Sequence, residues 1–571
     1  MIDLALFEQK ETLQTQLEEL EAQSILKRIW DHDHTVWSSN PSEISNRLGW
    51  LDIPVLMNQA QSKIKNLAES LRDEKTEKIV LLGMGGSSLA PDVFSRVFEK
   101  AKGYPELVVL DTTHPDAIAA VQSDLNLAKT TFIVATKSGS TVETLSLFRY
   151  FYNQLVEVVG NERAVDHFIA ITDPESALVA TAEKLNFRET FENDPDIGGR
   201  YSALSYFGLV PAALIGIDIE TLLQEALKVR QTSLPGESLE DNEAVVLGTI
   251  LGWMANIGRD KLTLISSVEI EPVGDWIEQL VAESTGKQGK GILPVVGERM
   301  GTPADYGSDR IFVHLRWKND SSFQPRLEAL ASRGHPVVIV DLDEIADLGG
   351  LFFLWELATA VAGYWMGINP FDQPNVESAK KRAKEMVAAF QEQGALPQEE
   401  PLLEDESLAI YLGAPGVPSE PSLGSDDSVE DAIKSFLRSG GEGAYVAIQA
   451  YLPPSDKLTG MLRELQVAVR DRTGLATTLG YGPRFLHSTG QLHKGDAGDG
   501  LFLQLTNETN TRIDIPDQPG SAQSTISFGT LINAQALGDR RALLDANRSI
   551  IRIALKGAPT QVVNALASVV A

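Results

Sequence analysis

The chain has 571 residues, of which 43% are hydrophobic and 22% are charged, a composition typical of a folded globular protein. This length exceeds what a single hydrophobic core supports, so roughly two to four domains are expected. Its 79 acidic and 49 basic residues give a net charge of −30, which argues against nonspecific binding to nucleic acid or to an anionic membrane.

The sequence also limits the cellular setting and the available chemistry. It contains no cysteine, which excludes disulfides, thiolate metal sites and cysteine nucleophiles and favours a cytoplasmic location. The N-terminus, Met1–Ala5, has no basic stretch before an apolar run, and no segment approaches the roughly eighteen uninterrupted apolar residues of a membrane span. We therefore expect a cytoplasmic protein with no membrane partner.

In chain order, the first expected element is an amphipathic helix. Apolar residues recur at helical spacing between Leu4 and Trp30, among Glu and Gln side chains. We expect residues 1–45 to form an N-terminal helical arm that packs against the rest of the protein and carries no functional site.

Two sets of short apolar runs follow, each run separated from the next by a turn and a helical stretch. The first set comprises Ile79–Leu82, Leu107–Leu110, Phe132–Ala135 and Phe168–Ile171. The second set comprises Leu262–Ile265, Ile292–Val295, Ile311–Val313 and Val337–Val340. Continuous apolar strands that alternate with helices are typical of parallel sheets covered on both faces. We expect two α/β domains, over residues 46–235 and 236–395.

A linker and a third domain complete the expected organisation. Residues 396–430 are rich in Pro, Glu, Asp, Ser and Gly, which is typical of a linker with at most one short strand. Apolar runs at Tyr445–Ile448 and Leu501–Leu505, with a helix around Arg540–Asn547, predict a smaller α/β domain over residues 431–571.

A glycine-rich turn follows the first expected strand. Residues Gly83–Leu89 read GMGGSSL, and a helix is expected from about Ser88. Glycines at such a junction let backbone N–H groups approach an anion, and the helix N-terminus adds partial positive charge. Such a turn is also a common packing solution, so the pattern alone leaves both interpretations open. The glycine spacing differs from the dinucleotide-binding pattern G-x-G-x-x-G.

A hydroxyl-rich loop follows the third expected strand. Between Thr136 and Thr141 the chain places four hydroxyl side chains, one lysine and one glycine just before an expected helix. Hydroxyl groups donate hydrogen bonds to phosphate oxygens, and a lysine supplies positive charge. An ordinary helix cap needs only one such residue, so the loop favours a phosphate site.

These two loops, with motifs further along the chain, resemble those of a known enzyme family. The loops resemble sugar-isomerase (SIS) domains, and Asp196–Ser202 resembles a signature of the glucose-6-phosphate isomerase family. Further matches follow in family order at Gln279, Glu283–Lys287, Phe371–Gln373 and Lys380. Tyr481–Gln491 and the long third domain are similar to the isomerase half of bifunctional transaldolase/glucose-6-phosphate isomerases.

The resemblance implies an α/β fold of two SIS-type parallel-sheet units plus a smaller C-terminal α/β domain. It also implies an isomerase of glycolysis and gluconeogenesis that interconverts glucose 6-phosphate and fructose 6-phosphate. The implied reaction is a proton transfer through a cis-enediol(ate), without a metal or organic cofactor. A homodimer is implied as well, and association or fusion with a transaldolase is expected in some relatives.

The family's roles carry over to the residues that match its motifs. Glu283 corresponds to the base that moves the proton, Arg200 to the group beside the enediolate, and Lys380 to a lysine that helps to open the sugar ring, with Lys381 as the alternative register. Gln279 precedes Glu283 by four residues and would project from the same face of a helix. The implied phosphate-binding residues are Gly86, Ser87, Thr136, Lys137, Ser138 and Thr141.

One family feature is missing. A histidine that opens the sugar ring, contributed by the adjacent subunit, usually follows the base in a G-T-x-x-x-H segment, whereas residues 301–310 here read GTPADYGSDR. The candidates for that role are Asp309, His487 and His493. Alternatively, Lys380 acts together with spontaneous ring opening.

Two other functions remain open at this stage. A related isomerase would also accept mannose 6-phosphate, and a non-catalytic sugar-phosphate-binding regulator would need the phosphate loop alone. Glu283, Arg200 and Lys380 favour an enzyme, because a regulator needs neither a base, nor an enediolate stabiliser, nor a ring-opening lysine. Asp31–His34 carries metal-binding residue types on a polar turn, where no metal is expected.

Overall fold

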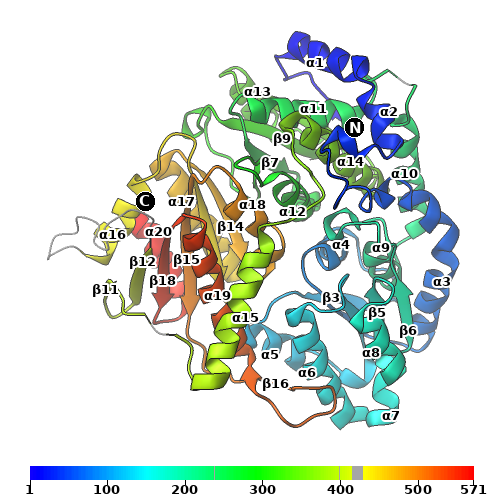
Figure 1. Ribbon diagram of the computed structural model, residues 1–571, viewed down its shortest axis with the longest axis vertical. Helices are drawn as coiled ribbons and strands as arrows, with labels where there is room; N and C mark the ends of the chain where they lie inside the picture. Colours follow the sequence, from blue (N-terminus) through cyan, green and yellow to red (C-terminus); the bar gives the residue numbers. More distant parts are fainter. Residues whose placement is uncertain (237, 398, 414–427, 571) are drawn as a thin grey trace.

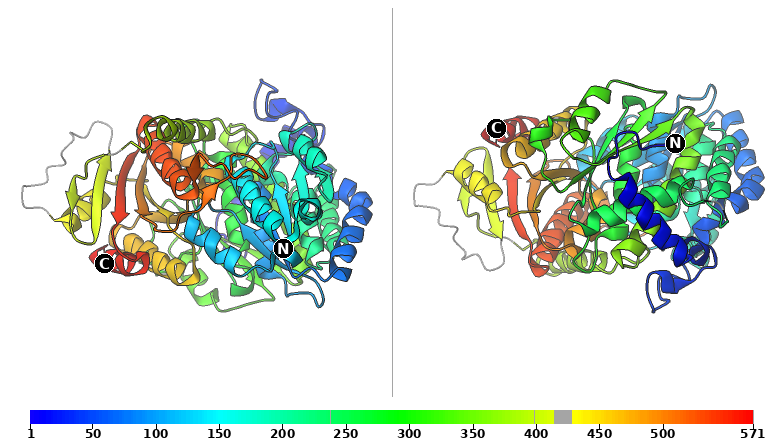
Figure 2. Two further views of the ribbon diagram at one scale, coloured as in Figure 1. Left: turned by 90° about the horizontal axis from the view of Figure 1, so that it is seen from below. Right: turned by 90° about the horizontal axis from the view of Figure 1, so that it is seen from above.

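The computed structural model describes residues 1–571 except 237, 398, 414–427 and 571, and for residues 377, 379 and 380 it describes the backbone alone (Figure 1). The described residues form three main sheets, each flanked by helices. The first two sheets and their helices form one body, and the C-terminal domain lies to one side of it, as Figure 2 shows. The predicted fold class, two parallel-sheet α/β units with a C-terminal α/β domain, is confirmed.

The first sheet holds five parallel strands in the order β3-β2-β4-β5-β6. Its strands are β2 (Lys78–Leu82), β3 (Glu106–Leu110), β4 (Thr130–Ala135), β5 (Phe168–Thr172) and β6 (Glu189–Glu192). The connecting helices are α4 (Leu89–Val97), α5 (Pro115–Ser123), α6 (Val142–Val159), α7 (Asn161–Ala164) and α8 (Ala177–Leu185). Along β2, Ile79 and Leu81 enter one hydrophobic core whereas Val80 and Leu82 enter another. Burial on both faces explains why these strands read as continuous apolar runs.

The second sheet has the strand order β1-β10-β9-β7-β8. Its strands are β1 (Ile2–Asp3), β7 (Lys261–Ser266), β8 (Leu293–Val295), β9 (Arg310–Trp317) and β10 (Val337–Leu342). Its helices are α11 (Glu243–Asn256), α12 (Val273–Thr285), α13 (Gln324–Ala331) and α14 (Leu348–Met366). Strands β7 to β10 are parallel, whereas β1 pairs antiparallel with β10.

The N-terminal arm differs from its prediction at one point. It contains the expected helical part, as α1 (Lys10–Ala22) and α2 (Ile25–Trp30), but it begins with β1, which adds an edge to the second sheet. A strand of two residues is too short to show the alternation of apolar and polar residues that predicts a strand. Strand β1 is therefore recognised only from the pairing of Ile2 with Val340 in the structure.

The interior where the first two units meet is built from helices. They are α3 (Ile53–Asp73), α9 (Tyr206–Leu214), α10 (Ile219–Thr232) and α14. The segment Ile345–Met366 is the one stretch among the described residues that is long and apolar enough to cross a membrane, with a mean hydropathy of 1.5. Because most of this segment is buried inside the fold, we interpret it as a core helix. Trp276 and Trp355 are buried there.

The third sheet has the order β11-β12-β18-β15-β13-β14. Its strands are β11 (Leu403–Glu404), β12 (Leu408–Gly413), β13 (Tyr445–Tyr451), β14 (Ala476–Tyr481), β15 (Gly500–Asn507) and β18 (Ser549–Leu555). Its helices are α16 (Val429–Arg438), α17 (Asp456–Thr473), α18 (Gly490–Gly495), α19 (Phe528–Asp545) and α20 (Pro559–Val570). The predicted linker, 396–430, therefore contains two strands rather than at most one. Leu408 and Ile410 are buried in the core of this sheet, which holds β12 in place.

Three of the contacts that join the C-terminal domain to the other units involve whole elements. A hairpin of β16 (Asp514–Ile515) and β17 (Ile526–Ser527) places Ile515 in a core of the first unit. Helix α15 (Val376–Gln393) lies along α19 (Figure 1). Helix α18 packs so closely on the end of α12 that a Cβ atom on Gly286 would lie 2.2 Å from the Cα atom of Leu492. These contacts bring the third domain to the edge of the site described next.

Candidate active site

A cavity of about 630 Å³ lies where the two N-terminal units and the C-terminal domain meet. It is lined by the glycine-rich turn after β2, the hydroxyl-rich loop after β4, one face of α12, part of α15 and His487 of the C-terminal domain. Loops at the carboxyl ends of parallel strands are where open α/β sheets bind ligands. The cavity therefore gathers residues that the sequence predicts for two tasks, anion binding and proton transfer.

The glycine-rich turn borders the cavity and also packs against the loop that contains Gly199 and Arg200. Gly85–Ser87 forms one 3₁₀ turn before α4, and Ser87 lines the cavity. A Cβ atom on Gly86 would lie 2.1 Å from the carbonyl oxygen of Gly199, so a side chain at this position would force the two loops apart. Because Gly199 directly precedes Arg200, this close packing helps to position the arginine. Gly86 thus serves the packing of the two loops, while Ser87 remains available to a ligand in the cavity.

The hydroxyl-rich loop presents its donors at the N-terminus of α6. The Oγ1 atoms of Thr136 and Thr141 lie 2.8 Å apart, and the Oγ atoms of Ser138 and Ser140 lie 2.9 Å apart, so each pair shares a hydrogen bond. Apart from the buried Thr136, these side chains line the cavity. An 18-residue helix begins at Val142, and its N-terminus adds partial positive charge. The loop therefore carries the hydrogen-bond donors and the partial positive charge that an anion site needs.

Lys137 supplies the positive charge at this end of the cavity. Its Nζ donates to the carbonyl oxygen of Pro195 at 2.9 Å and forms an ion pair with Asp173, which also lines the cavity. Burial raises the pKa of Asp173, while the lysine opposes that rise. A phosphate group would thus meet a lysine whose position is already fixed by two oxygen acceptors.

Helix α12 carries the predicted base. The side chains of Gln279 and Glu283 project from one helical face, as expected, and Gln279 Nε2 donates to Glu283 Oε2 at 3.2 Å. The opposite side of the helix packs in the hydrophobic core through Ile277 and Val281. This amphipathic pattern fixes the rotation of α12, so that Glu283 faces the cavity although only 5% of its surface is exposed.

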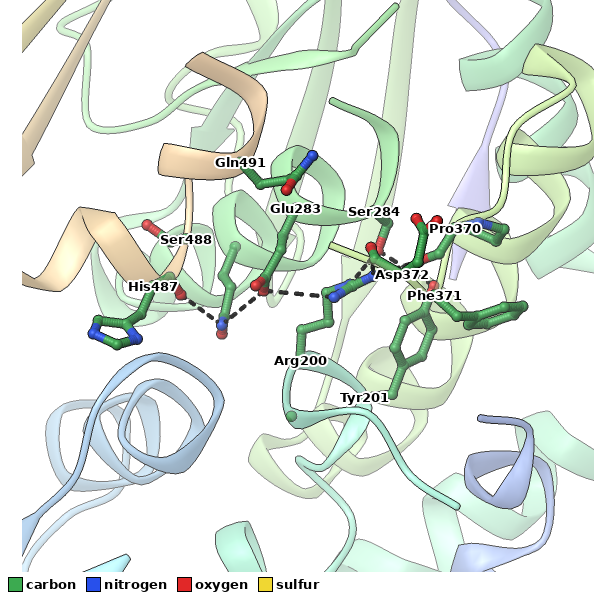
Figure 3. A network of polar contacts seen from close by, with 12 residues as sticks. Arg200, Tyr201, Glu283, Ser284, Pro370, Phe371, Asp372, His487, Ser488 and Gln491 are labelled. Carbon is green, nitrogen blue, oxygen red and sulfur yellow. Dashed lines mark hydrogen bonds and ion pairs between the residues drawn. The ribbon is translucent and has the colours of Figure 1, made fainter. Parts of the chain in front are cut away.

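Arg200 lies beside this carboxylate in a fixed orientation (Figure 3). Its Nη1 is 3.8 Å from Glu283 Oε2, its Nε donates to Ser284 Oγ at 2.7 Å, and its Nη2 donates to the carbonyl oxygen of Pro370 at 2.7 Å. A second carbonyl, that of Asp372, accepts from Nη2 at 3.1 Å. The Nε and Nη2 atoms of the guanidinium group are therefore fixed by hydrogen bonds, and Nη1 is directed toward Glu283.

Lys287 is a buried cation next to this pair. Its Nζ donates to Oδ1 of Asp372 at 2.8 Å and to the carbonyl oxygen of the same residue. Burial, and then the charge of Arg200, lowers the pKa of Lys287 to about 7, whereas Asp372 acts in the opposite direction. Lys287 thus holds Asp372, and through the Asp372 carbonyl it supports the position of Arg200.

Stability is expected to depend on pH through Lys287. Its pKa in the folded chain, about 7, lies below the ordinary value of 10.5, so between these values the unfolded chain binds a proton that the folded chain does not. The free energy of unfolding should therefore rise as the pH increases above about 7, by at most about 1.4 kcal/mol per pH unit. Urea titrations near pH 7 and at about pH 9 should show this rise in the unmodified protein and not in Lys287→Met. An equal rise in both proteins would contradict the assignment.

The remaining predicted residues lie in different surroundings. His487 lines the cavity, whereas His493 is buried inside the C-terminal domain, where burial lowers its pKa well below the ordinary value. Asp309 directly precedes β9, and its carbonyl oxygen accepts from the backbone N–H of Lys261 at 3.0 Å. Of the residues that the structure describes, those lining the cavity include neither His493 nor Asp309. Lys380 belongs to α15, but its side chain lies outside the described residues.

Several functional contacts were not predicted from the sequence. Ser284 and the carbonyl groups of Pro370 and Asp372 orient Arg200. Glu143 and Gln535 border the cavity from elements far apart in the chain. Ser284 could have been predicted, because it lies next to Glu283 inside a family motif. The carbonyl groups could not, because every residue has one and the sequence does not show which of them accepts a hydrogen bond.

The sequence of this chain is similar to those of known isomerases. A phosphoglucose isomerase family model matches residues 53–295. The glucose-6-phosphate isomerase of Staphylococcus saprophyticus is 30% identical over 406 residues, which cover 63% of this chain and 90% of that protein. The glucose-6-phosphate isomerase of Staphylococcus aureus strain Mu3 is 29% identical over 385 residues, covering 59% of this chain and 86% of that protein.

Solved structures agree at the level of the fold. A hypothetical protein from Thermus thermophilus superimposes with a TM-score of 0.59 and 25% identity, covering 68% of this chain and 99% of that chain. A glucose-6-phosphate isomerase from Chlamydia trachomatis superimposes with a TM-score of 0.55 and 20% identity, covering 66% of this chain and 86% of that chain. With a 30% identical relative matched over nine tenths of its length, the chain belongs to the glucose-6-phosphate isomerase family.

Proposed function

We propose that this chain interconverts glucose 6-phosphate and fructose 6-phosphate. The observation that carries the proposal is the buried carboxylate of Glu283, 3.8 Å from the guanidinium of Arg200, in a cavity that also contains the hydroxyl-rich loop. The two sugar phosphates differ in the position of one carbonyl group, so the reaction needs a base and a group that stabilises an oxyanion. Relatives named glucose-6-phosphate isomerase support the same activity.

The phosphate group of the substrate would bind at the N-terminus of α6. Ser138, Thr141 and Ser87 have hydroxyl groups that can donate to its oxygens, and Lys137 offers a positive charge within a protein whose net charge is −30. Anchoring the phosphate at one end of the cavity would place the first two carbons of the open-chain sugar at the other end, near α12. Such positioning converts binding energy into a reactive orientation.

Glu283 and Arg200 would then divide the chemistry. The carboxylate of Glu283 takes the proton from the carbon next to the carbonyl group and returns it to the neighbouring carbon, so it ends the cycle unchanged. In between, negative charge develops on the oxygen of the enediolate, where Arg200 stabilises it. Ser284 and Pro370 already hold the guanidinium in place, so it needs little reorganisation as the charge forms.

A coupled assay tests the proposed activity. Purified protein is mixed with fructose 6-phosphate, NADP⁺ and an excess of glucose-6-phosphate dehydrogenase, and NADPH formation is followed in the presence and absence of EDTA. NADPH formation that persists in EDTA is the expected result. Binding of fructose 6-phosphate without turnover would instead leave the sugar-phosphate-binding regulator as the function.

The homodimer and the glycolytic or gluconeogenic setting stay predictions from the family resemblance, and the cytoplasmic location stays a prediction from the composition and the N-terminus. Sedimentation velocity at micromolar chain concentration distinguishes a dimer from a monomer. The dimer question is separate from whether one chain contains a complete site, which depends on His487.

A further inference from the structure

His487 enters the cavity on a loop of the C-terminal domain that is fixed at its backbone. The carbonyl oxygen of His487 accepts a hydrogen bond from Gln279 Nε2 at 2.8 Å, the same amide group that donates to the predicted base Glu283 (Figure 3). The loop lies against the glycine-rich turn, because a Cβ atom on Gly85 would be 2.6 Å from that carbonyl oxygen. The backbone of His487 is thereby held between the glycine-rich turn and Gln279, the neighbour of the predicted base.

The imidazole ring is oriented by a buried carboxyl group from another domain. His487 Nε2 lies 3.0 Å from Glu143 Oε1, and Glu143, in the first turn of α6, is buried. Gln535 Nε2 donates to the same oxygen at 2.7 Å, and Thr113 Oγ1 donates to Gln535 Oε1 at 2.7 Å. The ring is therefore fixed by a chain of polar contacts that joins the first unit to the C-terminal domain.

This arrangement selects one tautomer of the ring. An ionised carboxyl group only accepts hydrogen bonds, so opposite an ionised Glu143 the Nε2 atom of a neutral ring carries the proton and Nδ1 keeps its lone pair. Within the part of the chain that the structure describes, the ring of His487 has its hydrogen bond at Nε2 and none at Nδ1. The side chain of His487 retains 16% exposure, which it presents to the cavity. Histidine can both accept and release a proton near neutral pH.

We propose that His487, positioned by Glu143, opens the sugar ring, so that the C-terminal domain completes the active site within one chain. The inference rests on the proposed isomerase function. For glucose 6-phosphate, Nδ1 takes the proton from O1 while the C1–O5 bond breaks, a C1=O1 double bond forms, and the electron pair of the broken bond stays on O5. The same proton then passes from Nδ1 to O5, so no proton is gained or lost overall. His487 would be the catalytic residue and Glu143 the positioning residue.

The other two candidates fit this role less well. His493 is 2% exposed and lies among aromatic rings of its own domain, with centroid distances of 5.1 Å to Phe502 and 6.3 Å to Tyr445. Asp309 lies at the start of β9, next to the first residue of β7. Neither side chain borders the cavity among the described residues, so neither reaches a sugar bound there.

A substrate that cannot form a ring tests the inference. Fructose 6-phosphate closes through O5, whereas 5-deoxyfructose 6-phosphate lacks that oxygen and, with O6 phosphorylated, stays open. With His487→Asn, kcat/KM for fructose 6-phosphate should fall by ~10²–10⁴-fold, because an acid–base group typically contributes that much. For the open substrate it should change by less than about threefold, since the later proton transfer uses Glu283. Glu143→Gln should show the same selectivity with a smaller loss, because it keeps the shape of the positioning group and removes its charge.

The control variant is His32→Asn, far along the chain in an exposed turn. His32 has a φ of 57°, a backbone conformation that asparagine adopts readily, so this variant should fold and keep both activities. An equal loss on both substrates in His487→Asn would make the residue structural, and no loss on either would remove it from the reaction; both results overturn the inference. If the unmodified protein turns over neither substrate, the proposed isomerase function itself fails.

A mixing experiment tests whether the histidine serves its own chain. Glu283→Gln and His487→Asn are mixed, dissociated and reassociated, and the activity on fructose 6-phosphate is measured. Because His487 contacts both Glu143 and Gln279 of its own chain, the mixture should be no more active than the sum of its parts. Recovery of activity would show that an intact histidine from one chain acts on an intact base of another, which would overturn the single-chain site.

Discussion

Glu283→Gln is expected to lower kcat for the conversion of fructose 6-phosphate by ~10²–10⁴-fold, the range over which a general base contributes to catalysis. Glutamine keeps the size of the side chain and can still bond to Gln279, but it cannot take a proton from carbon. Binding of the substrate should change little, because the proposed phosphate contacts come from other lining residues, Ser87 and those of the hydroxyl-rich loop. The coupled assay gives kcat, and isothermal titration with fructose 6-phosphate gives the dissociation constant.

The matched control for this prediction is Glu269→Gln, an exposed glutamate that precedes the same helix. It should retain the kcat of the unmodified protein. A Glu283→Gln variant that folds normally and keeps most of its kcat would remove Glu283 from the role of base.

Arg200→Lys is expected to lower kcat by ~10²–10³-fold, as the loss of one fixed oxyanion-stabilising donor does in other enzymes. Lysine keeps the positive charge but cannot reproduce the planar fork that bonds to Ser284 Oγ and the carbonyl oxygen of Pro370 at 2.7 Å each. The ammonium group would therefore have to reorganise as the enediolate forms. KM should change less than kcat, because the contact matters most when the charge has developed.

The control here is Arg299→Lys, a conservative change in an exposed ion pair with Glu464. It should leave both kcat and the thermal unfolding midpoint close to those of the unmodified protein. A decrease in Arg200→Lys that tracks loss of folded protein, rather than loss of turnover per folded molecule, would assign Arg200 a structural role only.

Much of the fold could be predicted because its strands are buried on both faces. The four runs of the first unit and the four of the second become β2 to β5 and β7 to β10, within four residues at each end. Such strands carry a strong local signal, a continuous apolar run. The short strands β1, β11 and β6 carry no such signal, because two to four residues do not establish a period and tertiary pairing decides their state.

The site could be predicted where its residues are close in sequence. Gln279 and Glu283 are four apart on one helix, and the 3.2 Å contact between them follows from helical geometry. The contact of His487 with Glu143 joins residues separated by 344 positions, so no local pattern contains it. Likewise, the cavity depends on how the C-terminal domain packs against the first two units, which composition and periodicity do not specify.

The most direct test of the central claim is isomerisation of fructose 6-phosphate in D₂O, followed by NMR for the unmodified protein and for Glu283→Gln. If Glu283 carries the proton between C1 and C2, its carboxylic acid exchanges with D₂O in a fraction of turnovers before the proton is returned, so deuterium should accumulate at C2 of the glucose 6-phosphate over repeated turnovers. The account predicts this label in the unmodified protein and a loss of conversion and labelling together, by ~10²-fold or more, in Glu283→Gln. Conversion with no deuterium at C2, or labelling that continues unchanged in Glu283→Gln, would contradict it.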